Sequence, residues 1–512
     1  MNTPHIRLGP NTAPLGRQFV VTWSIPDNFG GMTGAFLHRS RAFVRLAGST
    51  VDILTFDARP NYPEVEADLR AKGELIDGMN LLNLWDWLRE FGLPADASGV
   101  AVHHRFTPLE TDGAFRSTYR GDRELTRSRY SADGAIELQV DYYRTDGTLL
   151  ATDRRDSLRH GVKGGRSIVV CDASGAPVKS WGSSWGLYAF WMDQLRGAEP
   201  CVMFVDSKTA ANFMVGYRRP GALIAHVVHS SHLVGTERPI APIRETRKFV
   251  FENLPEFDAV IVLTERQKSD IEVLLGAQDN LYVVPNGREL ASESGTASDT
   301  RPRERGIMLA TLTPRKRITH AVNAAVAASA SVSGIRLDIY GEGEEREKLE
   351  TAIASSPHAV ATLHGYNPNA RREFETASFM MLTSTSEGFP LVLVESMAAG
   401  CLPIAYDISY GPADMITDRV NGFLVPPGDQ EALAAAIVEL QQLDGDTVSA
   451  MRASARSASS SFTDEAVTRL WVDVLSQARK QRQTRPSVPV SVRVVRRMRR
   501  TLALARRLLA RR

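Results

Sequence analysis

The sequence is poor in cysteine and has no long apolar run. Its 512 residues include three cysteines, Cys171, Cys201 and Cys401, which lie far apart. They form neither a disulfide framework nor a metal-ligand spacing, and they suit a reducing compartment. No uninterrupted apolar run reaches about 18 residues, and residues 1–19 hold no apolar core of signal-peptide length. We therefore expect a cytoplasmic protein that is soluble or attached peripherally to the membrane.

The net charge is also small. Lys and Arg number 61 against 59 Asp and Glu, which leaves a formal charge of +2. This excludes a general polyanion-binding surface, and we expect no nucleic-acid partner. The charge is uneven, because residues 493–512 contain nine arginines and no acid. An argument for polyanion binding therefore concerns the tail alone.

What the sequence does contain is a repeated alternation of strands and helices. Residues 18–24 are typical of a first strand, followed by a glycine-bearing loop at 27–34, a helical stretch and a strand at 51–56. Further strands are predicted at 202–205, 222–228, 259–263, 306–311, 335–340, 379–383 and 402–405, with a helix at 392–399. Such alternation predicts an α/β fold with parallel sheets, here two doubly wound, Rossmann-like domains.

A different pattern interrupts the first half, at 62–199. Ile136, Leu138, Val140 and Tyr142 alternate with polar residues, which is the period-two pattern of a β-strand. Asp-Gly pairs at 133–134 and 146–147 flank this run and suit hairpin turns. We expect an inserted domain of antiparallel strands.

The segment 384–400, STSEGFPLVLVESMAAG, concentrates the polar residues of a ligand site. Ligands of doubly wound folds bind beyond the carboxyl ends of the strands. The first amides of the predicted helix, near Leu391 and Val392, are free donors suited to a phosphate. Glu387 precedes this helix and Glu395 lies about one turn inside it, so the two carboxylates can address different parts of one ligand. For an isolated pair of glutamates, a dipole-favoured acid and a solvent-facing acid would explain the pattern equally well.

This segment resembles the motif of two glutamates separated by seven residues in retaining GT-B glycosyltransferases of family 4. The resemblance implies that Glu387 contacts the donor sugar near the reacting carbon and that Glu395 holds the ribose hydroxyls of the nucleotide. It implies donor contacts for the neighbouring positions as well, namely Gly388, Phe389, Pro390, Leu391 and Val392.

A basic turn follows the first strand of the second half. Cations at such a turn suit a diphosphate, because they offset the charge that builds on the leaving group. The family has an arginine, four residues, and a lysine here; Lys316 matches the lysine, but Thr311 occupies the arginine position. Arg315 or Arg317 is the candidate for the missing charge. Taken alone, the turn fits a solvated basic loop.

Other stretches extend the resemblance. His364-Gly365-Tyr366 resembles the segment whose backbone contacts the nucleobase. Gly30-Gly31 follows the first strand, where small residues let the backbone approach a phosphate or sugar, although a plain turn explains them too.

Three histidines, His226, His229 and His232, are closely spaced. They lack a partner acid at a metal-ligand spacing. The family resemblance implies one active-site histidine at this strand end, for which we select His229, with His232 second.

The inserted strands, with 204–208, resemble those of poly(glycerol-phosphate) α-glucosyltransferases, which glycosylate teichoic acids. The resemblance implies a UDP-sugar donor, transfer of glucose or N-acetylglucosamine with retention, and no metal or other cofactor. Three alternatives stay open: a family-4 enzyme acting on a protein or lipid-linked glycan, a retaining phosphorylase, for which no pyridoxal phosphate lysine is apparent, and a non-catalytic nucleotide-sugar-binding partner.

The expected organisation then follows from the resemblance. Residues 1–61 and 200–300 form the first Rossmann-like lobe and a linker, 62–199 the β-rich insertion, 301–465 the donor-binding lobe, 466–487 a return helix and 488–512 a basic tail. The exposed strand edges of the insertion favour a homo-oligomer.

The tail has an apolar stripe with arginines on its other sides. This stripe consists of Val495, Met498, Leu502, Ala505 and Leu509. The pattern favours an interfacial helix on an anionic membrane, a grip on a polyanionic acceptor, or a solvated basic tail.

Overall fold

The computed structural model describes residues 16–27, 29–94, 115–131, 133–155, 166–290, 301–356 and 360–484. Residues 291–300, at the end of the segment predicted to hold the linker, and the predicted tail at 488–512 lie outside these ranges. Within the described ranges, no helix has the length and apolar content needed to cross a membrane.

Seven parallel strands form the first sheet, in the order β13-β12-β11-β10-β1-β2-β3. Their bounds are β1 (Arg17–Val21), β2 (Val51–Thr55), β3 (Met79–Asn83), β10 (Cys201–Val205), β11 (Ala222–Val228), β12 (Ala259–Val262) and β13 (Leu281–Val283). The chain runs outward from β1 to β3 and then returns to β10 on the other side of β1, which is a Rossmann-like order. Every residue of β10 and β11 is buried, as expected for strands covered on both faces.

Six parallel strands form the second sheet, in the order β16-β15-β14-β17-β18-β19. Their bounds are β14 (Arg305–Leu309), β15 (Arg336–Tyr340), β16 (Ala361–Gly365), β17 (Phe379–Leu382), β18 (Leu402–Tyr406) and β19 (Phe423–Val425). The order again reverses beside the first strand, between β14 and β17. The predicted alternation of strands and helices is confirmed in both halves.

The inserted strands form a separate antiparallel meander, in the order β4 to β9. Their bounds are β4 (Phe115–Arg120), β5 (Arg123–Tyr130), β6 (Glu137–Tyr143), β7 (Leu149–Arg154), β8 (Ser167–Cys171) and β9 (Pro177–Trp181). Gly134 and Gly147 have positive φ values of 70° and 87° at the turns beside β6, as the Asp-Gly signal predicts. The predicted boundary at residue 62 is wrong, because β3 pairs with β2 in the first parallel sheet and the antiparallel strands begin only at β4.

Fourteen α-helices occur among the described residues. They are α1 (Gly31–Ala47), α2 (Tyr62–Ala71), α3 (Leu84–Phe91), α4 (Ser184–Arg196), α5 (Lys208–Met214), α6 (Glu245–Phe251), α7 (Glu265–Leu275), α8 (Ile318–Ser329), α9 (Arg346–Ala354), α10 (Leu391–Ala398), α11 (Pro412–Met415), α12 (Gln430–Gln442), α13 (Gly445–Ser459) and α14 (Asp464–Thr484). Short 3-10 turns are η2 (Leu254–Glu256), η3 (Pro314–Lys316), η4 (Ala370–Glu375) and η5 (Ser460–Phe462).

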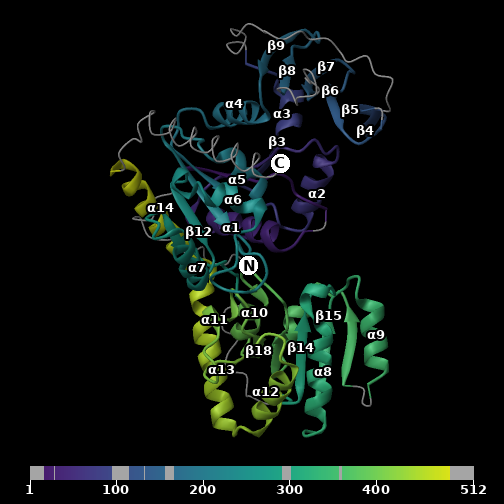
Figure 1. The fold of residues 1–512 in the computed structure, drawn as a ribbon, viewed down its shortest axis with the longest axis vertical. Coiled ribbons are helices and arrows are strands. Elements are labelled where there is room, and N and C mark those ends of the chain that lie inside the picture. The colour runs from purple at the N-terminus through teal and green to yellow at the C-terminus, as the bar shows by residue number, and fades with distance from the viewer. Residues whose placement is uncertain are drawn as a thin grey trace, which may run out of the picture.

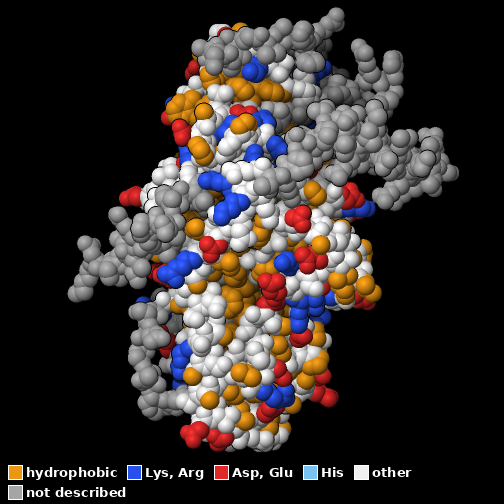
Figure 2. Space-filling view, turned by 90° about the vertical axis from the view of Figure 1, so that its left-hand side faces the viewer, with side chains coloured by type: hydrophobic (Ala, Val, Ile, Leu, Met, Phe, Trp, Pro, Cys, Tyr) orange, Lys and Arg blue, Asp and Glu red, His pale blue; other side chains and the backbone are white. Residues whose placement is uncertain are grey.

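The three sheets follow one another along the long axis of the molecule, with the inserted strands at the top and the second parallel sheet at the bottom (Figure 1). The view from the side shows acidic and basic side chains interspersed over the lower part (Figure 2). This mixture agrees with the nearly equal numbers of basic and acidic residues in the whole chain, 61 and 59.

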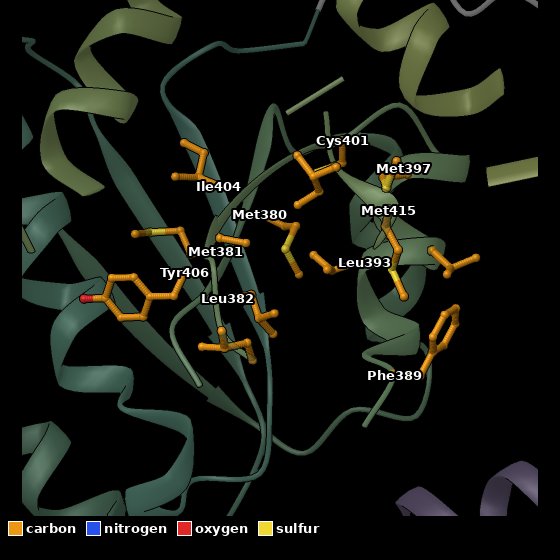
Figure 3. Close-up of a cluster of buried hydrophobic side chains, with 14 of the residues drawn as sticks. Met380, Met381, Leu382, Phe389, Leu393, Met397, Cys401, Ile404, Tyr406 and Met415 are labelled. Carbon is orange, nitrogen blue, oxygen red and sulfur yellow. The ribbon is translucent and has the colours of Figure 1, made fainter. Parts of the chain in front are cut away.

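The core beneath the 384–400 segment is rich in methionine. Met380 of β17 lies between Ile404 of β18 and Leu393 of α10 (Figure 3), and all three are fully buried. These contacts fix α10 against the sheet. The end of the helix that follows Pro390 is thereby held at the carboxyl edge of β17.

The return helix α14 packs on the first sheet rather than on the second (Figure 1). Trp471 meets the rings of Phe43 in α1 and Phe204 in β10 edge to face, with centroids 6.2 and 5.3 Å apart. Near the other end of α14, Tyr282 of β13 donates a hydrogen bond to Gln481 over 2.9 Å. The C-terminal helix thus completes the N-terminal domain.

We expect Trp471→Ala to lower the free energy of unfolding by about 3–5 kcal/mol, because it leaves a large cavity between α1, β10 and α14. Leu470→Ala is the matched control, since Leu470 is 36% exposed, whereas Trp471 is 3% exposed. Urea unfolding measures both. Equal losses in the two variants would contradict this packing.

Candidate functional site

A large cleft lies between the two parallel sheets, at the carboxyl ends of their strands. Its lining includes Gly30 and Gly31 at the start of α1, His229 after β11, Lys316 after β14 and Glu387 after β17. It lies at the strand-order reversals of both sheets, where open α/β sheets bind ligands. Its volume of about 3090 Å³ exceeds the roughly 300–1,000 Å³ of an ordinary small-molecule pocket. Two substrates can therefore occupy it together.

Glu387 is held by two cations on the wall formed by the second sheet. Its Oε1 accepts hydrogen bonds from Lys316 Nζ over 2.6 Å and from Arg315 Nη1 over 2.9 Å. Burial alone would raise the pKa of Glu387, but the charges of Lys316 and Arg315 outweigh it and hold the pKa below its usual value. The carboxylate is thus ionised and in contact with the basic turn.

Glu395 also pairs with two cations. Its Oε1 lies 2.6 Å from Nε of Arg288 and 3.0 Å from Nε of Arg371. All three residues line the cleft. Arg288 follows the end of the first domain and Arg371 comes from η4, so residues far apart in sequence converge on this glutamate. Neither arginine was predicted from the sequence.

The start of α10 offers free backbone donors between the two glutamates. Pro390 is the N-cap, and no side chain caps the helix. Leu391 and Val392 line the cleft, as do Gly388 and Phe389. The first amides of a helix have no hydrogen-bond partner within it, and they lie at the positive end of the helix dipole. This end of α10 can therefore hold an anionic group.

The two walls of the cleft touch at one glycine. A Cβ built on Gly388 would lie 2.0 Å from the carbonyl oxygen of His229 and 3.4 Å from Cα of Ser230. No side chain fits there, so only glycine allows this approach. The contact places the Glu387 loop directly beside the strand end that carries His229.

His229 is oriented by a buried ion-pair chain. Its Nε2 lies 2.7 Å from Oδ1 of Asp206, whose carboxylate also binds both Nη atoms of Arg39 at 3.0 and 2.8 Å. A carboxylate only accepts hydrogen bonds, so Nε2 carries a proton, and Nδ1 has no partner among the described residues. The ring can therefore accept a hydrogen bond at Nδ1. No local sequence pattern indicates Asp206 or Arg39 as partners of this histidine.

His226 and His232 do not share this setting. His226 is buried and contacts the backbone oxygen of Val205 through Nδ1. His232 is also buried, stacked against the rings of Phe251 and Tyr410, and it does not line the cleft. The structure thus separates the three histidines, and the described residues contain no group of three or more candidate metal ligands.

Of the remaining predicted residues, some line the cleft and others do not. Tyr366 lines the cleft and is 75% exposed, while Gly365 lies at the end of β16 just behind it. Thr311 and Arg315 also line it. Arg317 does not: its guanidinium lies near Gly428, because the residue adopts a left-handed conformation with φ of 46° that turns it away. The structure therefore leaves Arg315, and not Arg317, beside Thr311 at the cleft.

The comparisons with known proteins agree with this geometry. Residues 301–458 match the family described as glycosyl transferases group 1. This part of the chain, which carries the glutamates and the basic turn, is a group 1 glycosyltransferase domain. The chain is a glycosyltransferase.

Two relatives extend the match beyond that domain. The chain is 25% identical over 472 residues to the poly(glycerol-phosphate) alpha-glucosyltransferase of Bacillus subtilis (strain 168), covering 83% of this chain and 70% of that protein. It is 21% identical over 471 residues to the poly(ribitol-phosphate) alpha-N-acetylglucosaminyltransferase of Staphylococcus aureus (strain COL), covering 83% and 92%. A crystal structure of a mutant of S. aureus TarM in complex with Fondaparinux, alpha-GlcNAc-glycerol and UDP has a TM-score of 0.64 at 20% identity, covering 90% of this chain and 99% of that chain. That likeness shows a shared fold.

The burial of His232 predicts that the free energy of unfolding depends on pH. Burial lowers the pKa of His232 from 6.5 to about 4. Between these values the unfolded chain takes up a proton that the folded chain does not, so the free energy of unfolding falls as the pH falls, by up to about 3 kcal/mol. We expect His232→Phe, which keeps the ring stacking, to reduce this loss. Urea unfolding at pH 7 and pH 4.5 measures it, and an identical acid-induced loss in both proteins would refute it.

Proposed function

We propose that this chain is a retaining GT-B glycosyltransferase that transfers a hexose, glucose or N-acetylglucosamine, from a UDP-sugar to a hydroxyl of a cell-envelope polymer. Poly(glycerol phosphate) or a related teichoic acid is the acceptor we expect. One observation carries the proposal: Glu387, Lys316 and the free amides of α10 face the same cleft as the oriented His229. The names of the two relatives that match over 83% of this chain support the choice of acceptor.

The donor diphosphate fits the wall that holds Lys316 and the start of α10. Lys316 and Arg315 both pair with Glu387. A diphosphate is a stronger partner for these cations than one carboxylate, so its arrival frees Glu387 to contact the sugar. The cations and amides then stabilise the charge that develops on the departing diphosphate.

We assign binding of the acceptor to the opposite wall of the cleft, which carries His229. Retention follows when the acceptor hydroxyl attacks from the face that the diphosphate leaves, with a diphosphate oxygen helping to take the hydroxyl proton. His229, fixed by Asp206, lines the cleft beside the place we assign to the sugar. Glu395 accepts hydrogen bonds from the ribose hydroxyls, as the family resemblance implies.

Several predictions from the sequence remain part of this proposal. UDP-sugars are supplied in the cytoplasm, so we place the protein there or on the inner face of the membrane. Attachment through residues 488–512 and self-association through the inserted strands stay predictions. Exposed Phe115 and Tyr119 on the edge strand β4 support self-association.

We expect Glu387→Gln and Lys316→Ala each to reduce turnover by about 100-fold or more, because each removes charge that stabilises the transition state. Release of UDP from a panel of UDP-sugars, with glycerol-phosphate polymer or a protein as acceptor, measures the activity. Glu431→Gln is the control, since Glu431 is exposed in the first turn of α12. Near-wild-type transfer by both site variants would refute the assignment, and transfer to protein alone would replace the acceptor.

The position of Arg315 generates a separate prediction. We expect Arg315→Ala to weaken UDP binding about fivefold, in line with the loss of one partly exposed charge pair. Arg317→Ala should leave the dissociation constant unchanged, because Arg317 does not line the cleft. Thr311→Arg should be tolerated. Calorimetric titration with UDP tests all three variants, and an equal effect of the two alanine substitutions would contradict the role of Arg315.

A further inference from the structure

Two arginines stand on the wall of the cleft that carries His229. Arg244 is the N-cap of α6 and Arg247 lies in its first turn, and both line the cleft. Nη2 of Arg247 donates a hydrogen bond to Oγ of Ser230 over 2.6 Å. Ser230 follows His229, whose carbonyl oxygen is the atom that would lie closest to a Cβ built on Gly388. Arg247 is thus fixed near the point where the two walls touch.

These two cations differ from those on the opposite wall. Lys316 and Arg315 are paired with Glu387, and Arg288 and Arg371 with Glu395. No acidic partner is recorded for Arg244 or Arg247 in the part of the chain that the structure describes. Their positive charge faces the cleft without a counter-charge.

The electrostatic state of Arg247 agrees with such an arrangement. Burial and the nearby charge of Arg244 lower the pKa of Arg247 to about 10. The guanidinium therefore stays protonated at neutral pH, although two neighbouring like charges destabilise each other. A bound anion would relieve both the repulsion and the loss of hydration.

We propose that Arg247 and Arg244 form a phosphate-binding subsite beside His229. A guanidinium presents parallel N–H donors that match two oxygens of a phosphate group. Arg247 is held by Ser230 through only one of its nitrogens, which leaves other donors for a ligand. The subsite therefore selects ligands that carry a phosphate group near the reacting hydroxyl or sugar.

Two ligands of the proposed reaction carry a phosphate group, so the choice between them rests on the proposed function. One is the diphosphate of the donor, and the other is a phosphodiester of the acceptor polymer. We expect the acceptor to be the source, because Lys316 and the amides of α10 already serve the donor on the opposite wall. A phosphate next to the accepting hydroxyl would then distinguish this acceptor from neutral glycans.

Calorimetry on the full chain tests the subsite in two arms, with UDP alone and with a synthetic glycerol-phosphate trimer added to UDP-saturated protein. We expect Arg247→Ala to weaken binding of the trimer at least tenfold and binding of UDP less than twofold. Lys248→Ala is the matched control, because Lys248 is the next residue of α6, pairs with Glu245 at 3.5 Å and does not line the cleft. This control should bind both ligands like the wild type.

Each outcome has a defined meaning once circular dichroism shows that the variants are folded. Loss of UDP binding alone supports the subsite and assigns it to the donor diphosphate. Binding of both ligands within twofold of wild type by Arg247→Ala overturns the subsite, as does an equal loss in Lys248→Ala. The proposed function fails separately: if the wild type binds the trimer through Arg247 but transfers no sugar from any UDP-sugar, the subsite stands and the reaction does not.

Discussion

The buried carboxylate of Asp206 is the group on which the arrangement of the cleft depends. Its side chain is fully buried, and Arg39 and His229 are its two partners. Burial would raise the pKa of Asp206, but the charge of Arg39 outweighs it and the group stays ionised. A buried ion without its partner is strongly destabilising, so each of the three residues fixes the others. Arg39 also lies over the rings of Phe204 and Trp471, which connects the orientation of His229 to the packing of α14.

The ion pairs of the cleft place cations where they can exchange a glutamate partner for a bound anion. On the wall of the second sheet, each glutamate pairs with two cations. The cations are therefore already close to where a diphosphate would need them, and the protein does not have to gather like charges when a donor arrives. The same pairs supply counter-charges to the two largely buried carboxylates. Stability and readiness to bind an anion thus come from the same contacts.

Sequence patterns predicted most of the fold because buried parallel strands are continuous apolar runs. The predicted strand at 222–228 coincides with β11, and those at 51–56 and 379–383 differ from β2 and β17 by one residue. The boundary of the insertion could not be found in this way, because β3 (MNLLN) is partly exposed and mixes polar with apolar residues, so it is not a continuous apolar run. Glu387, Lys316 and His229 were identified through motif resemblance and do share the cleft. Arg247, Arg288 and Arg371 were missed, since tertiary contacts between distant segments leave no local signal.

The packing of α14 on the first sheet has a consequence for synthesis on the ribosome. The central strand β1 is made first, yet its neighbour β10 begins only at Cys201. The aromatic cover of β10 arrives with Trp471, after the entire second sheet has been made. Domains generally fold as units while the chain is being extended, but here part of the packing of the earlier domain comes from α14. The second sheet, whose strands all lie between residues 305 and 425, can therefore complete its hydrogen bonding before the domain that precedes it is closed.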